Sequence, residues 1–100
     1  MKIDKKQDGR ETTLLPAGRL DTSTAPQLDM EIQTILEDTD KLILNFQDLE
    51  YLSSAGLRVL LSAHKAFMKK ENGGMVIRNV NETIHEVFEV TGFLDILNVE

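Results

Sequence analysis

Two adjacent serines, Ser53 and Ser54, stand between a strand-like apolar run and a segment with helical spacing. Hydroxyl groups in that place lie at the N-terminus of a helix, where free backbone N–H groups and the positive end of the helix dipole favour negative charge. A phosphate attached to a serine there would be stabilised by the same groups that bind free phosphate. The alternative is that a serine only caps the helix, as serine commonly does.

A second candidate segment, Gly18-Arg19-Leu20-Asp21, closes an earlier strand. If both turns lie at one edge of a sheet, Asp21 comes near the two serines. Its carboxylate could then accept a hydrogen bond from a hydroxyl or from a cationic side chain of a partner. The alternative for Asp21 is a turn residue that binds its own backbone.

No catalytic set accompanies the serines. The hydrolase motif Gly-x-Ser-x-Gly lacks its first glycine in Leu52–Gly56. His64 lies ten residues along the same predicted helix, about 15 Å from Ser54, which is too far for a base. His85 is in another helix, and no phosphate-binding glycine loop or metal-ligand cluster occurs. We therefore expect no enzymatic activity, no cofactor and no metal.

The composition is typical of one soluble domain that spans residues 1–100, with 41% apolar and 28% charged residues. A net charge of −6 disfavours nucleic acid and anionic membranes as partners. The sequence has no cysteine, no apolar run long enough to span a bilayer and no recognisable secretory segment. We expect a cytoplasmic protein.

Apolar spacing predicts an α/β fold, with one mixed sheet of about four strands and three to four packed helices. Strands are predicted at 2–6, 11–20, 41–46 and 75–80, with a polar turn after the third. Helices are predicted from Thr24 to about residue 38–40, from about 54 to 70, and from Asn81 to Gly92, followed by a short helical turn. The strand-to-helix turns should lie at one edge, where sites collect in such folds.

Local signals refine these elements. Asp8-Gly9 predicts a hairpin turn, and Pro16 predicts an edge position or a bulge for its strand. Thr24 and Gln27 have the spacing of a capping box. The near-continuous apolar run 41–46 is typical of a central strand that is covered on both faces. In the second helix, the expected buried residues are Leu57, Leu60, Leu61 and Met68, and the expected polar stripe is Arg58, Ser62, Lys65 and Lys69.

With these residues in place, the chain resembles the STAS domain of bacterial anti-sigma factor antagonists over about residues 2–97. Gly18–Asp21 is similar to the Gly-x-Leu-Asp motif of the family, and Asn45–Leu57 is similar to its strand, loop and phosphorylation motif. Gly73-Gly74, Val87-Phe88 and Gly92-Phe93 resemble its later strand and helix.

The resemblance implies a binding protein that is switched by phosphorylation. The unmodified antagonist would bind an anti-sigma factor that is also a serine kinase, and so free a sigma factor. The kinase would phosphorylate one serine and release the antagonist, and a serine phosphatase would restore it. Ser54 corresponds to the phosphoacceptor, whereas Ser53 replaces a common aspartate and is the less favoured acceptor. The expected partner-binding face comprises Asp21, Thr22, Ser23, Ser53, Ser54, Gly56 and Arg58.

The resemblance also leaves a second function open. Free-standing STAS proteins serve as cytoplasmic accessory subunits of lipid-transporting ABC systems, without direct membrane contact. Such subunits need no phosphorylation, and the same loop would then be a docking surface.

Overall fold

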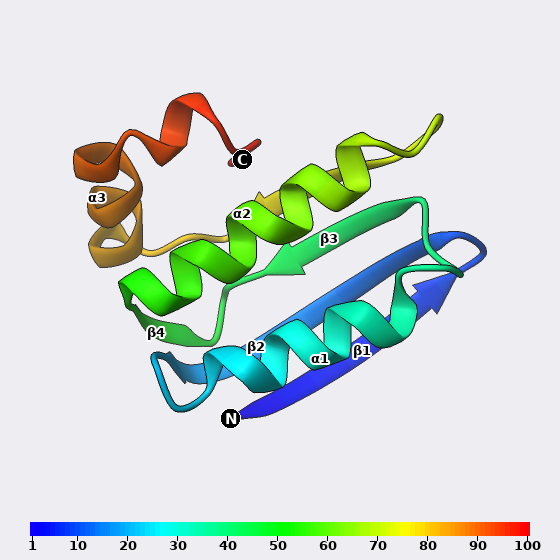
Figure 1. Ribbon diagram of the computed structural model, residues 1–100. Helices are drawn as coiled ribbons and strands as arrows, with labels where there is room; N and C mark the ends of the chain where they lie inside the picture. Colours follow the sequence, from blue (N-terminus) through cyan, green and yellow to red (C-terminus); the bar gives the residue numbers. More distant parts are fainter.

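Five strands form one mixed sheet, and two long helices lie side by side on one face of it (Figure 1). The computed structural model describes all 100 residues, Met1–Glu100. Hydrogen-bonded neighbours follow the order β1-β2-β3-β5, and β4 pairs with β2 beyond the end of β3. The elements in chain order are β1 (Lys2–Asp8), β2 (Glu11–Leu20), α1 (Ala25–Ile35), β3 (Lys41–Asn45), β4 (Leu49–Leu52), α2 (Ser54–Met68), β5 (Gly74–Arg78), α3 (Glu82–Thr91) and the 3-10 turn η1 (Phe93–Asp95).

The first two strands form the predicted antiparallel hairpin. Asp8 pairs with Glu11, so that only Gly9 and Arg10 form the turn. Gly9 has φ of 61°, in the left-handed region that glycine adopts without a steric penalty. All the other strand pairs, β2 with β3, β2 with β4 and β3 with β5, are parallel.

The prediction of about four strands and a polar turn after residue 46 missed β4. Leu49 and Leu52 are buried while the two residues between them are exposed, so this short strand lacks a regular alternation. The strand β2 pairs with β3 through Leu14 and with β4 from Gly18 onward. Pro16 lies between these two pairings, so its missing N–H removes no ladder bond to β3 or β4. Of the two alternatives predicted from Pro16, the edge position is wrong because β2 is a central strand, whereas a register irregularity does occur nearby, between Gly18 and Arg19.

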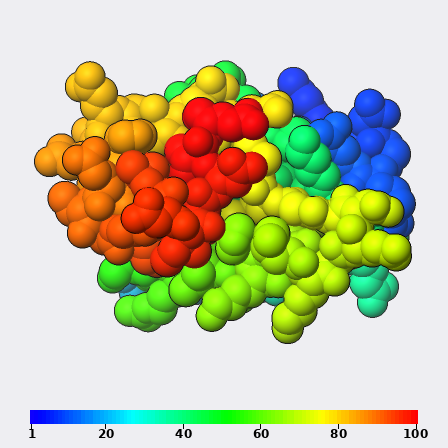
Figure 2. Space-filling model, turned by 90° about the horizontal axis from the view of Figure 1, so that it is seen from above, coloured from blue at the N-terminus to red at the C-terminus, as the bar shows by residue number.

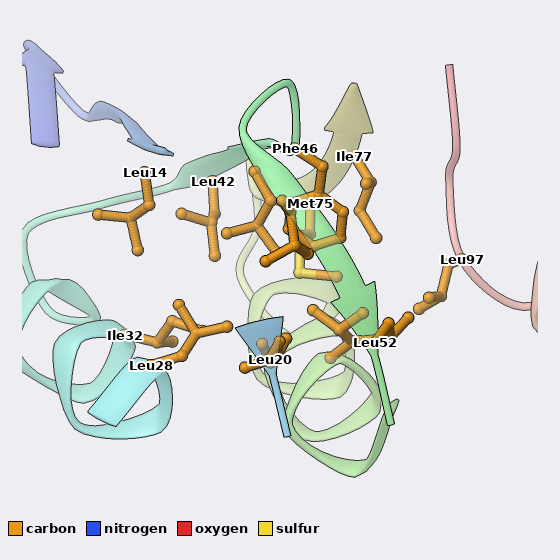
Figure 3. Packing of buried hydrophobic residues seen from close by; sticks show 14 of the residues in the cluster. Leu14, Leu20, Leu28, Ile32, Leu42, Phe46, Leu52, Met75, Ile77 and Leu97 are labelled. Carbon is orange, nitrogen blue, oxygen red and sulfur yellow. The ribbon is translucent and has the colours of Figure 1, made fainter. Parts of the chain in front are cut away.

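The main core lies between the sheet and the two long helices. Leu28 and Ile32 of α1 face Leu14 and Leu42 of the strands (Figure 3). The three middle residues of β3 are all buried, as predicted for a central strand, although no helix covers the opposite face in Figure 1. Ile43 of β3 is nevertheless buried on that face, beside its strand neighbour Val76.

The capping box predicted at the start of α1 does not form. Thr24 makes no side-chain cap bond, and its hydroxyl donates to the Arg19 carbonyl at 2.7 Å. The Gln27 amide instead donates to the carbonyl of Met1 at 2.7 Å. The cap of α3 does form as predicted, because the Asn81 side chain accepts from the Ile84 N–H at 2.8 Å.

The second helix begins at Ser54 as expected, and Leu57 and Leu60 are buried as predicted, but Leu61 is only half-buried. Met68 is 61% exposed, whereas its neighbour Phe67 is fully buried. The buried residues of α2 are Gly56, Leu57, Leu60, Ala63 and Phe67. None of the helices combines the length and the apolar composition that a membrane-spanning segment needs.

Candidate partner-binding site at the ends of β2 and β4

Parallel pairing of β2 and β4 brings together the turn that begins at Asp21 and the turn that contains Ser53. Leu20 pairs with Leu52, and the Ser53 N–H donates to the Leu20 carbonyl at 2.9 Å. Asp21 and Ser53 therefore follow directly from paired residues at the same edge of the sheet. The helix α1 begins just after the first turn and α2 just after the second (Figure 1). This confirms the predicted common edge.

Asp21 organises the turn that precedes α1. Its Oδ1 accepts from the Ser23 N–H at 3.0 Å, from the Ser23 hydroxyl at 2.7 Å and from the Thr24 N–H at 3.2 Å. These bonds, led by the one from the Ser23 hydroxyl, lower the pKa of Asp21 below its ordinary value of 3.8. The carboxylate bonds its own turn and neither of the two serines, which is the alternative the sequence left open.

The two serines have different environments. Ser53 is the N-cap residue of α2, yet its side chain makes no cap bond, and its Oγ is buried without a hydrogen-bond partner. Ser54 is the first residue of the helix and is exposed. The N–H groups of residues 54–56 have no partner within the helix, because its first backbone bond runs from Leu57 to the Ser53 carbonyl. An exposed hydroxyl thus stands beside free backbone donors.

Gly56 has a packing role in this site. It is buried, and a Cβ there would lie 2.6 Å from Leu52 Cδ1 and 2.8 Å from Leu20 Cγ. The absence of a side chain lets the first turn of α2 approach β2 and β4. Gly56 was predicted to line the partner-binding face, but it offers no exposed surface and instead sets the position of the serines.

The remaining predicted residues lie on the surface. Thr22 and Ser23 are exposed at the tip of the first turn, and Arg58 is exposed one helical turn after Ser54. Arg58 forms no ion pair.

The only cavity of appreciable size lies elsewhere, at the beginning of β5. It has a volume of about 450 Å³ and is lined by His64, Met68, Met75 and Asn98, among others. Figure 2 looks onto the face where the C-terminal residues lie in red. Neither Ser53 nor Ser54 lines this cavity. No group of His, Cys, Asp or Glu side chains in the protein could hold a metal ion.

Sequence comparison identifies the family. The model of the STAS domain matches residues 2–100. The chain belongs to the STAS domain family. This STAS domain is 29% identical over 97 residues to the anti-sigma-B factor antagonist of Bacillus subtilis (strain 168), covering 97% of this chain and 88% of that protein.

Solved structures show the same fold. The unphosphorylated form of the anti-sigma factor antagonist SpoIIAA superposes with a TM-score of 0.83 at 20% identity, covering 99% of this chain and 88% of that one. The phosphorylated form of the Bacillus cell fate determinant SpoIIAA gives 0.76 at 19% identity, covering 99% and 91%. The mixed sheet and three helices of this STAS domain match these neighbours.

Sequence reasoning did not assign a role to two residues of this STAS domain that lie beside the serines. The Arg19 guanidinium stacks over the Tyr51 ring, with its Cζ 4.1 Å from the ring centroid. The Arg19 Nε also lies 3.8 Å from an oxygen of Asp21. Arg19 and Tyr51 are strand partners across β2 and β4. Their contact was not predicted because β4 was not predicted.

Proposed function

We propose that this STAS domain is an anti-sigma factor antagonist that is switched by phosphorylation of Ser54. In its unmodified form it binds an anti-sigma factor that has serine-kinase activity, and thereby releases a sigma factor. The kinase transfers the γ-phosphoryl group of ATP to Ser54 Oγ, which leaves ADP and a proton. A serine phosphatase removes the phosphate and restores the binding form.

The exposed hydroxyl of Ser54 at the first residue of α2 is the observation that carries this proposal. The neighbouring Ser53 hydroxyl is buried, so an approaching kinase has direct access only to Ser54. The exposed surface around it is supplied by Thr22, Ser23 and Arg58. Asp21 and Gly56 hold the two turns in position.

Charge alone is a sufficient switch at this place. A phosphate adds about −1.5 to −2 charges, and the free N–H groups of α2 stabilise it within the same chain. A partner surface that is complementary to a neutral hydroxyl then meets like charge and a desolvation cost. The similarity of this chain to SpoIIAA in both of its forms supports a switch without refolding.

Incubation of the purified protein with its anti-sigma factor and radiolabelled ATP tests the proposal. We expect one phosphate per chain, located on Ser54 by peptide mass spectrometry. Ser54→Ala should abolish labelling, while the matched variant Ser53→Ala should keep it. Labelling of Ser54→Ala at the wild-type level would refute Ser54 as the acceptor. An ABC-transporter ATPase or permease as the stable partner would place the protein in the transport class instead.

A further inference from the structure

The cations on and just after α2 form none of the ion pairs of the chain. Ion pairs within 4.0 Å engage Arg10, Arg19, Lys41 and Arg78. The cations outside these pairs lie on β1, where acidic residues alternate with them, and on the segment 54–70. That segment contains Arg58, Lys65, Lys69 and Lys70 and no acidic residue, in a chain whose net charge is −6.

Two cations of α2 and its C-cap residue Lys69 form one exposed line that begins at the proposed phosphorylation site. Spacings of four, three and four residues place Arg58, Ser62, Lys65 and Lys69 on one side of the helix, and all four are exposed. We call these four residues the basic stripe. Ser54 stands four residues before Arg58 on the same side, and the line from Ser54 to Lys69 is about 22 Å long. The opposite side of α2 is buried against the sheet and α1.

We propose that the basic stripe is part of the docking surface and receives an acidic face of the anti-sigma factor. This inference rests on the proposed function, because it names the chemistry of the partner that binds at Ser54. Charge complementarity supports it: an acidic protein repels an acidic partner except where its own cations are concentrated. Here three cations lie within one helix face that is continuous with Ser54.

The stripe also places a cation within reach of the proposed phosphate. A phosphate on Ser54 lies one helical turn from Arg58, the spacing at which opposite charges on a helix interact. Adding about −1.5 to −2 charges at the head of a stripe of three cations offsets about half to two thirds of its positive charge. The modification therefore weakens attraction mainly at Arg58, because exposed charges more than about 8 Å apart are largely screened at physiological ionic strength.

Charge reversal at the far end of the stripe tests the inference. Lys65→Glu combined with Lys69→Glu changes the stripe at a distance from Ser54. Lys5→Glu combined with Lys6→Glu makes the same change in net charge on exposed residues of β1, at the other edge of the sheet. The probe is the purified anti-sigma factor, and the readout is the association rate constant at low and at physiological ionic strength.

We expect the stripe variant to associate about tenfold more slowly and with a weaker salt dependence than the wild type. The β1 variant should stay within about twofold of the wild type. Equal losses in both variants, or no loss in either, would overturn the inference. If the Glu variant folds poorly, Lys65→Gln combined with Lys69→Gln replaces it, because this variant adds no negative charge near the helix C-terminus. Its association rate constant should lie between those of the wild type and the Glu variant.

Ser54→Asp, measured in parallel, separates this inference from the proposed function. If Ser54→Asp weakens binding and the stripe variant does not, the function stands and the inference is wrong. If Ser54→Asp binds like the wild type, the proposed switch itself fails. A short DNA duplex and vesicles that contain phosphatidylserine serve as further probes. Stripe-dependent binding to either one would contradict an acidic protein as the occupant.

Discussion

At the scale of single residues, the site depends on the contrast between two adjacent serines. Both are polar and both precede the same helix, so their types alone do not distinguish them. The pairing of β4 with β2 fixes the Ser53 backbone against Leu20, and its hydroxyl is buried. Ser54, one residue later, is exposed at the first position of α2.

Because the Ser53 hydroxyl makes no cap bond, Ser53→Ala should leave the free energy of unfolding unchanged or raise it slightly. Loss of a working cap costs about 1 kcal/mol, and a buried hydroxyl without a partner is itself unfavourable. Asn81→Ala, which removes the working cap of α3, is the matched comparison and should lower the free energy of unfolding by about 1 kcal/mol. Urea denaturation of the wild type and the two variants measures both changes in the free energy of unfolding. An equal loss in Ser53→Ala would show that Ser53 does cap α2.

At the scale of elements, the position of α2 depends on close packing at Gly56. Gly56→Ala would gain about 1 kcal/mol in helix propensity, but overpacking of a filled core typically costs about 1–3 kcal/mol. A new Cβ would lie within 3.0 Å of side-chain atoms of both Leu20 and Leu52, so we expect a net loss of stability. Thermal unfolding measures it, with Ser62→Ala on the exposed side of α2 as the control. A stabilised Gly56→Ala protein would contradict the close approach.

The elements also show how far the sequence predicts this fold. The Asp8-Gly9 turn signal predicted the hairpin, and apolar spacing predicted the three helices and the strands β3 and β5. Asn81 was also correctly predicted to cap α3. The strand β4 was missed because only its two end residues are buried and because its partner in the sheet is distant in sequence. Missing β4 also concealed the stacking of Arg19 on Tyr51. The Thr24–Gln27 spacing predicted a capping box that does not form, because both side chains donate hydrogen bonds elsewhere. Thr24 donates to the carbonyl of Arg19 and Gln27 to the carbonyl of Met1.

At the scale of the whole molecule, two carboxylates make stability depend on pH. Hydrogen bonds from Arg10 lower the pKa of Asp40, and those from Ser23 lower the pKa of Asp21, both from an ordinary value of 3.8. A carboxylate with a lowered pKa in the folded state contributes stability above pH 3.8. That contribution is lost as the pH falls through the lower, folded-state value.

We therefore expect the stability difference between the wild type and Asp40→Asn to be full near neutral pH and to shrink as the pH falls below 3.8. The Arg10–Asp40 pair joins the β1–β2 turn to the start of β3, with Nε–Oδ2 at 2.9 Å. Denaturation by urea at a series of pH values measures the difference. Asp4→Asn is the control, since Asp4 is exposed on β1 and forms no ion pair. A difference that grows on acidification would contradict the assigned sign.

The affinity of the anti-sigma factor for Ser54→Asp, relative to the wild type, tests the central claim most directly. Gln33→Glu adds the same charge on the exposed side of α1, away from the site, and serves as the control. Titration calorimetry should show binding that is at least about tenfold weaker for Ser54→Asp, because like-charge contact at an interface is costly. The control should bind like the wild type. Equal affinity of Ser54→Asp and the wild type would show that charge at the start of α2 is not the switch.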